Sequence, residues 1–193
     1  MNEVGEHRGI ACIGWGSLIW RQESLPLRSA WFGGGPELPV EFARQSRNKS
    51  VTLVICPGRS LVPTRWAILD VPDIQAAKNA LAAREWNRAL EYPKWVQDNI
   101  GYWDRTTGAK HGMEADIVTA WASAQGLAGV VWTNLPCNIN GVNGSMPSED
   151  DVLELLRTLE GKHRHLAEEY VRNAPREVDT PYRRRIAREF GWE

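Results

Sequence analysis

A short glycine-containing loop near the start of the chain has the residue types to bind an anion. Directly after an apolar run, the loop consists of Gly14, Trp15, Gly16, Ser17 and Leu18. Two glycines on either side of one bulky residue allow neighbouring backbone N–H groups to point toward the same negative group. The same spacing is typical of a tight turn at a strand end, which is the commoner structure. The loop therefore indicates a simple turn or an anion-binding turn, and the glycines do not identify the ligand.

Better-known motifs do not fit this loop. The dinucleotide-binding fingerprint needs a third glycine, a helix that begins in the loop and an acidic residue about twenty positions later, none of which is evident. A P-loop needs Gly-Lys-Ser/Thr, which is missing. Ser17 lacks the following glycine of a nucleophile elbow. The loop is therefore not assigned to nucleotide binding or to serine hydrolysis.

Glu85 is the acidic residue best placed to act as a general acid or base. It follows Leu81 by four residues and continues an apolar stripe that begins at Ile74 with helical spacing. This position predicts a carboxylate that faces inward. However, Arg84 and Arg88 flank it, and a glutamate with basic neighbours is more often a solvated surface group in a weak ion pair. Both interpretations remain open on this pattern alone.

Arg44 and Ser46 are a second set of candidate binding residues. They alternate with Gln45 and Arg47 on or just after a predicted strand, so Arg44 and Ser46 share one face of it. A guanidinium has the geometry to bind a carboxylate with two hydrogen bonds. An ordinary polar outer face of a sheet explains the same alternation equally well.

Composition argues against several classes of function. The chain of 193 residues has 23 basic and 24 acidic side chains and a formal charge of −1, so no global basic field points to nucleic acid. The four histidines lack the spacing of a zinc site, and we expect no metal. Nowhere do eighteen apolar residues run together, so no membrane span is expected. A small-molecule partner is the interpretation that remains.

The cysteines and the N-terminal segment indicate a compartment. Cys12, Cys56 and Cys137 lie far apart and within or beside apolar runs, which is typical of buried thiols in a reducing environment. The polar segment Asn2–Gly9 has neither the basic nor the apolar region of a signal peptide. We therefore expect a soluble, cytoplasmic protein.

The elements that must position these residues predict an α+β fold. Short apolar runs bounded by turn residues predict a first strand and then an antiparallel meander, while helical signals dominate the second half. Residues 94–112 are expected to form loops and one short helix. All 193 residues are expected to form one domain, with a core at about 10–135 and C-terminal helices at about 148–193. The predicted strands are Ile10–Ile13, Leu38–Gln45, Val51–Cys56, Leu61–Val71 and Gly129–Thr133.

The predicted helices have recognisable beginnings. Asp73 is a candidate N-cap for the helix that carries Glu85, and Ser148 is one for a long helix that Leu166 and Tyr170 extend. Thr180 followed by proline predicts the start of a terminal helix. A second short helix is expected over residues 117–124.

The run from Ile13 to Trp20 resembles the opening motif of a known family. It is similar to the Phe-Gly-Tyr-Gly-Ser-Leu-Ile/Met-Trp of the ChaC-like, glutathione-specific branch of the γ-glutamyl cyclotransferase-like family. The later motifs of that branch follow in order, over about residues 10–86. They are an arginine- and serine-bearing strand at 42–47, Pro57-Gly58, a strand with Trp66, and a helix that ends in Leu-x-x-Arg-Glu at 81–85.

The resemblance implies a fold and a reaction. The fold would be a small mixed, largely antiparallel sheet or partly closed barrel with surrounding helices. The reaction would release 5-oxoproline and an amine from a γ-glutamyl peptide or amine, without a metal or organic cofactor. Glu85 would be the catalytic acid and base. Gly14, Trp15, Gly16, Ser17, Leu18, Arg44 and Ser46 would bind the substrate.

The sequence also departs from the family pattern. Trp15 stands where the family has tyrosine, and Trp86-Asn87-Arg88 follows Glu85 where the branch has Gly-Gly-Tyr. Ten tryptophans are unusual for this length, and such rings serve a core or line a pocket. The alternative to an enzyme is therefore a non-catalytic small-molecule-binding or interaction module on the same scaffold.

Overall fold

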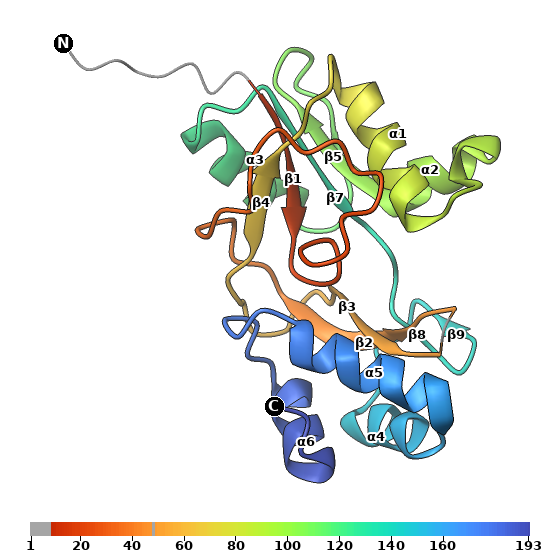
Figure 1. The fold of residues 1–193 in the computed structure, drawn as a ribbon. Coiled ribbons are helices and arrows are strands. Elements are labelled where there is room, and N and C mark those ends of the chain that lie inside the picture. The colour runs from red at the N-terminus through yellow and green to blue at the C-terminus, as the bar shows by residue number, and fades with distance from the viewer. Residues whose placement is uncertain (1–8, 48) are drawn as a thin grey trace. The chain divides into compact units, whose positions relative to one another are not determined.

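The computed structural model describes residues 9–47 and 49–193. Residues 2–8 of the predicted leaderless segment and Asn48 of a predicted turn lie outside the described residues. The described chain is α+β, with six α-helices and two mixed sheets, and neither sheet closes into a barrel (Figure 1). None of its helices is both long and apolar enough to cross a membrane.

The chain divides into two compact units built from alternating segments. The first unit contains the described residues up to Gly14, together with Gln22–Pro36 and Arg65–Asn134. The second contains Trp15–Arg21, Glu37–Thr64 and Leu135–Glu193. Each unit has one of the two sheets.

The sheet of the first unit has the strand order β4-β1-β7-β5-β6. β1 pairs in parallel with β7, and the other pairs are antiparallel. The strands are β1 (Ile10–Gly14), β4 (Arg65–Ile68), β5 (Ile100–Asp104), β6 (Lys110–His111) and β7 (Gly129–Thr133). The helices are α1 (Ile74–Glu85), the 3-10 helix η1 (Ala89–Glu91), α2 (Pro93–Asn99) and α3 (Ala115–Ala124).

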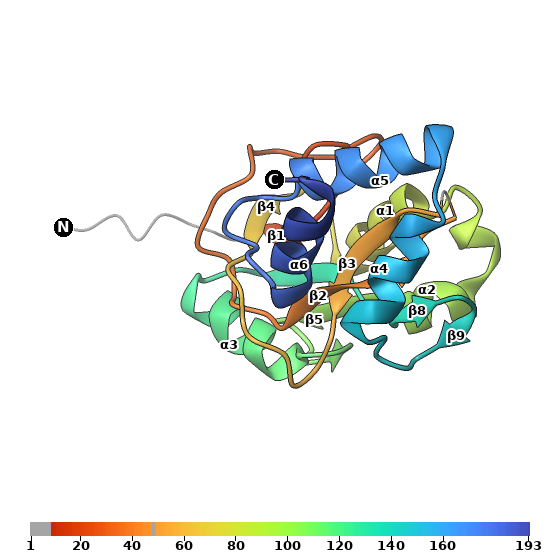
Figure 2. The same ribbon diagram turned by 90° about the horizontal axis from the view of Figure 1, so that it is seen from below.

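Helices cover both faces of this sheet (Figures 1 and 2). Gly129 of β7 faces α1, because a Cβ there would lie 3.1 Å from Ile74 Cδ1. Trp132 of β7 points to the other face, since its odd separation from Gly129 reverses the side-chain direction. Its indole N–H donates to the carbonyl of Met113, just before α3, at 3.2 Å. α1 and α3 therefore pack on opposite faces of β7.

α1 begins and ends where local chemistry predicts. The side chain of Asp73 accepts a hydrogen bond from the Ala76 N–H at 2.7 Å, which satisfies one donor of the first turn. Ala77 and Leu81 are fully buried against the sheet. The helix ends at Glu85, because Trp86 adopts an extended conformation. Glu85 thus stands at the carboxyl end of a helix anchored on the sheet.

The sheet of the second unit has the strand order β3-β2-β8-β9. The three C-terminal helices pack against it, α5 along β3, α6 along β2 and α4 along β8. The strands are β2 (Val40–Gln45), β3 (Val51–Ile55), β8 (Asn138–Ile139) and β9 (Val142–Asn143). The helices are α4 (Glu149–Arg157), α5 (Gly161–Asn173) and α6 (Pro181–Phe190).

Three details of the predicted arrangement are wrong. β4 does not continue the meander, since it pairs with β1 in the other sheet. The segment predicted as loops and one helix contains β5, an interior strand of its sheet. The long helix from Ser148 is two helices, because α4 ends at Arg157 and Gly161 has a positive φ of 49° at the start of α5.

The cysteines are buried and free, as predicted. Cys56 and Cys137 meet inside the second unit with their sulfur atoms 3.4 Å apart. The hydrogen bond with Cys56 lowers the pKa of the Cys137 thiol, and the nearby charges of Arg44 and Arg59 act in the same direction.

The second unit encloses a glutamate, Glu41 of β2, which has no exposed surface. Its carboxylate accepts hydrogen bonds from the Phe42 N–H at 2.8 Å, the Tyr182 N–H at 3.3 Å and the Thr180 hydroxyl. Burial nevertheless raises the pKa of Glu41 above its ordinary 4.5, and these hydrogen bonds only partly oppose that effect. The folded protein therefore holds a proton on Glu41 more tightly than the unfolded chain does.

This difference in the pKa of Glu41 predicts a pH-dependent stability. The contribution of protonated Glu41 to the free energy of unfolding is fully present below pH 4.5. It is lost as the pH rises through the higher pKa that Glu41 has in the folded protein. The slope is at most about 1.4 kcal/mol per pH unit for one proton. As the pH rises through this range, the wild type should lose unfolding free energy, whereas Glu41→Gln, which has no carboxylate at this position, should not. The stability of the variant relative to the wild type should therefore increase with pH. Urea unfolding at a series of pH values measures it, and Glu37→Gln, at an exposed site, is the control.

Candidate functional site

The residues predicted to form a site belong to both units. Gly14 ends β1, and Glu85 ends α1, in the first unit. Trp15, Gly16, Ser17 and Leu18 belong to the second unit, as do Arg44 and Ser46, which come from β2 and the turn after it. Each group has its own geometry.

The carboxylate of Glu85 is held against the first unit. Its Oε1 accepts a hydrogen bond from Nη1 of Arg84 at 2.7 Å, and the two side chains are only 15% and 8% exposed. The charge of Glu85 also reaches Cys12 on β1, where it adds to the effect of burial in raising the pKa of the thiol. Glu85 is therefore largely shielded from bulk solvent, and its charge is near enough to Cys12 to act on it.

The position of Cys12 relates Glu85 to the start of the glycine loop. Cys12 and Gly14 are two residues apart on β1, so the side chain of Cys12 and the Cα hydrogen at the side-chain position of Gly14 lie on the same face of the sheet. α1 packs against β1 and β7. Within the first unit, the structure thus brings Glu85 to the strand that leads into the loop. A carboxylate that is largely shielded yet still reachable can exchange protons with a bound substrate.

The loop after β1 is an ordered turn. The indole N–H of Trp15, whose side chain is buried, donates to the carbonyl of Leu53 at 3.2 Å. The carbonyls of Gly16 and Ser17 accept from the N–H groups of Ile19 and Arg21 at 3.0 and 2.7 Å. The loop is therefore pinned through its carbonyls and its tryptophan ring.

Several backbone donors of this loop have no acceptor. Trp15, Gly16 and Leu18 are buried, and their N–H groups donate to no group within residues 9–47 and 49–193. Buried backbone N–H groups without a partner are rare, because the loss of hydration is costly. Three such donors within four residues can bind the oxygen atoms of an anionic ligand. The glycine spacing had left a simple turn and an anion-binding turn as alternatives, and these donors are compatible with the second.

Tyr170 of α5 is a site residue that the sequence did not reveal. Its hydroxyl accepts from the Leu53 N–H at 3.3 Å, and it lies where a Cβ on Gly16 would be. Its ring packs edge-on to Trp20 and Phe42, with centroids 5.3 and 6.2 Å away. The sequence placed Tyr170 on the apolar face of a helix, and no local signal linked it to the loop. A tyrosine hydroxyl from α5 therefore lies directly beside the loop at Gly16.

Arg44 and Ser46 stabilise their surroundings. Nη1 of Arg44 donates to the carbonyl of Pro136 at 2.6 Å. The backbone of Ser46 forms a turn, in which its N–H donates to Ser50 at 2.8 Å and its carbonyl accepts from Lys49 at 2.9 Å. Their described hydrogen bonds hold loops of the second unit together. These contacts do not place them beside the unpaired N–H groups of the glycine loop.

Searches for related proteins add no assignment. No model of a known protein family, no curated protein and no solved structure matches the chain. Within the part of the chain that the structure describes, no three His, Cys, Asp or Glu side chains cluster as metal ligands would.

Proposed function

We propose that the protein is a γ-glutamyl cyclotransferase-type enzyme. It would convert a γ-glutamyl peptide or amine into 5-oxoproline and a free amine, with Glu85 as general acid and base. The proposal includes the fold type, a small mixed sheet with surrounding helices. The observation that carries it is the shielded carboxylate of Glu85, which ends a helix that packs on the strand leading into the glycine loop.

The chemistry needs one carboxylate and a set of donors. Glu85 takes a proton from the α-ammonium group of the γ-glutamyl moiety, and the resulting amine attacks the γ-carbonyl carbon. The bond from this carbon to the leaving nitrogen then breaks as the protonated Glu85 gives its proton to that nitrogen. The regenerated carboxylate takes the second proton that the ring nitrogen loses and passes it to the departing amine, which leaves as an ammonium ion. Because one carboxylate makes both transfers, the scheme needs no cofactor. Ring closure within one bound molecule is favoured, because the nucleophile is already attached.

The unpaired loop donors support the same proposal. The reaction places negative charge on the γ-carbonyl oxygen, and the substrate carries a carboxylate at its α-carbon. N–H groups that have no protein acceptor stabilise such oxygens without reorganisation. Trp15, Gly16 and Leu18 of the second unit carry three N–H groups that have no acceptor among residues 9–47 and 49–193.

An assay of the purified protein tests this function directly. The protein is incubated with glutathione and with a panel of γ-glutamyl amines and peptides, and 5-oxoproline is quantified by mass spectrometry. We expect release from at least one member that depends on enzyme concentration. If no member of the panel gives 5-oxoproline, the proposed function is wrong.

A non-catalytic binding module is the second candidate. The contacts of Trp15 with Leu53 and of Arg44 with Pro136 favour it, because they use predicted substrate-binding side chains to hold the fold. Such a module would bind a γ-glutamyl compound without turnover. Calorimetric binding without 5-oxoproline release would favour this candidate over the enzyme.

A further inference from the structure

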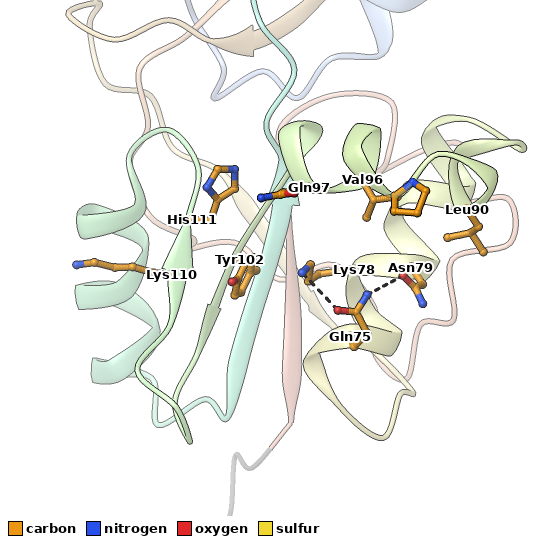
Figure 3. Close-up of a pocket in the computed structure, with 10 residues that line it drawn as sticks. Gln75, Lys78, Asn79, Leu90, Val96, Gln97, Tyr102, Lys110 and His111 are labelled. Carbon is orange, nitrogen blue, oxygen red and sulfur yellow. Dashed lines mark hydrogen bonds between the residues drawn. The ribbon is translucent and has the colours of Figure 1, made fainter.

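The first unit contains a pocket of about 600 Å³ that the proposed reaction does not use. It lies between α1, the η1–α2 segment and strands β5 and β6 (Figure 3). Glu85 does not line it. Ten residues do: Gln75, Lys78, Asn79, Leu90, Pro93, Val96, Gln97, Tyr102, Lys110 and His111.

Lys78 is the central cation of the pocket. Its ammonium lies over the Tyr102 ring, 4.2 Å from the centroid, and donates to Oε1 of Gln75 at 3.4 Å. No carboxylate of the described chain pairs with it. Burial lowers the pKa of Lys78, so its positive charge is incompletely compensated by the protein. An anion in the pocket would supply that compensation.

The rest of the lining is polar at one side and apolar at the other. None of the ten residues is acidic, whereas the whole chain carries a net charge of −1. Gln75, Asn79 and Gln97 add amide groups that can donate hydrogen bonds. Leu90, whose side chain is half exposed, and Val96 lie on the side away from His111 (Figure 3). Lys110 contributes little charge, because it points away and pairs with Asp116.

We propose that this pocket binds a small organic carboxylate with an apolar group. The carboxylate is held by Lys78 and the amide side chains. The apolar group packs on Leu90, Pro93 and Val96 and beside the Tyr102 ring. A free inorganic anion would leave the apolar side unused, and an uncharged apolar molecule would leave Lys78 without a counter-charge.

The site is distinct from the proposed catalytic residue, although both are on α1. Glu85 lies seven positions after Lys78 on α1, which is about 10 Å of helix rise. Binding in this pocket therefore requires neither the carboxylate of Glu85 nor the glycine loop. For this reason a test of binding in this pocket can succeed or fail whether or not the protein has cyclotransferase activity.

Calorimetric titration of the full chain with benzoate and with uncharged benzamide tests the pocket. We expect benzoate to bind with a Kd of about 1 mM and benzamide at least about tenfold more weakly, since the ammonium of Lys78 discriminates between them. Lys78→Met should weaken benzoate binding about tenfold. Amide-resolved NMR spectra should place the perturbed signals in α1, α2 and β5.

Two variants control for indirect effects. Lys94→Met removes a cation of α2 that lies outside the pocket, and it should leave the affinity for benzoate unchanged. Glu85→Gln should also bind benzoate like the wild type. Lys78→Gln repeats the test if Lys78→Met lowers the melting temperature. Equal binding of benzoate and benzamide, full affinity in both Lys78 variants, or no binding at about 20 mM benzoate would each overturn the proposal.

Discussion

Replacing Glu85 by glutamine should lower kcat for 5-oxoproline formation by at least about 100-fold and change KM little. Glutamine keeps the size of the side chain and can still accept a hydrogen bond from Arg84. It cannot take a proton from the substrate ammonium or return one to the leaving amine. The rate of 5-oxoproline release from the best substrate of the panel, at saturating concentration, measures the effect.

Glu91→Gln is the matched control for this substitution. Glu91 is an exposed glutamate six residues later, and it forms an ion pair with Arg88 at 2.8 Å. It should keep kcat within about twofold, because exposed ion pairs contribute little. If Glu85→Gln turns over at the wild-type rate, the proton-transfer role of Glu85 is wrong, even if the protein releases 5-oxoproline.

Gly16→Ala should destabilise the second unit by about 1 to 3 kcal/mol. A Cβ on Gly16 would collide with the hydroxyl of Tyr170, which is held between Leu53 and two aromatic rings. Tyr170→Phe removes the colliding oxygen, although it also removes the acceptor of the Leu53 N–H. We therefore expect the double variant to lose less free energy of unfolding than the sum of the two single losses. Urea unfolding of all four proteins measures this coupling.

Gly33→Ala provides the control for the alanine itself. A Cβ on Gly33 meets no atom within 4 Å, so this change should stay within about 0.5 kcal/mol of the wild type or stabilise slightly. Additive losses for Gly16→Ala and Tyr170→Phe would show that the two residues are not in contact. The loop would then lack the wall that Tyr170 provides.

The sequence predicts the elements of this fold where a signal is local. Asp73 and Ser148 both cap helices as expected, and Ser148 forms a reciprocal capping box with Asp151. β1 and β7 follow from short apolar runs that fit a buried strand, and they pair in parallel at the centre of their sheet. These features depend only on residues a few positions apart.

The elements that the sequence missed depend on distant partners. The run that contains β4 is as apolar as its neighbours, so nothing local tells that it pairs with β1 instead of β3. β5 carries glycine, tyrosine, tryptophan and aspartate, and its burial comes from β7 and from helices on both faces. The break between α4 and α5 lies inside an apolar pattern that continues across it, with buried Leu159 in the gap.

In the candidate site, too, features set by nearby residues could be anticipated from the sequence, and features set by distant contacts could not. The stripe of Leu81 favoured a shielded Glu85, while the flanking arginines favoured a surface ion pair; the structure shows both, a side chain 15% exposed and paired with Arg84. The glycine spacing indicated either a simple turn or an anion-binding turn, and it could not say which N–H groups would lack an acceptor. The contact of Tyr170 with Gly16 could not be predicted, because it joins an α5 side chain to a loop near the other end of the sequence. Arg44 is directed to Pro136 by a similarly distant contact.

The alternation of segments between the two units also has consequences for folding during synthesis and for truncation of the chain. Neither unit is a continuous stretch of sequence, since each takes three separate segments. During synthesis the first unit has all its described residues once Asn134 has emerged, whereas the second must wait for α6. Contacts between such distant segments slow folding, because the chain loses the entropy of closing long loops before the stabilising contacts can form. No single cut in the gene can therefore yield either unit alone, and a truncation before α4 removes a layer from a sheet whose strands β2 and β3 were made much earlier.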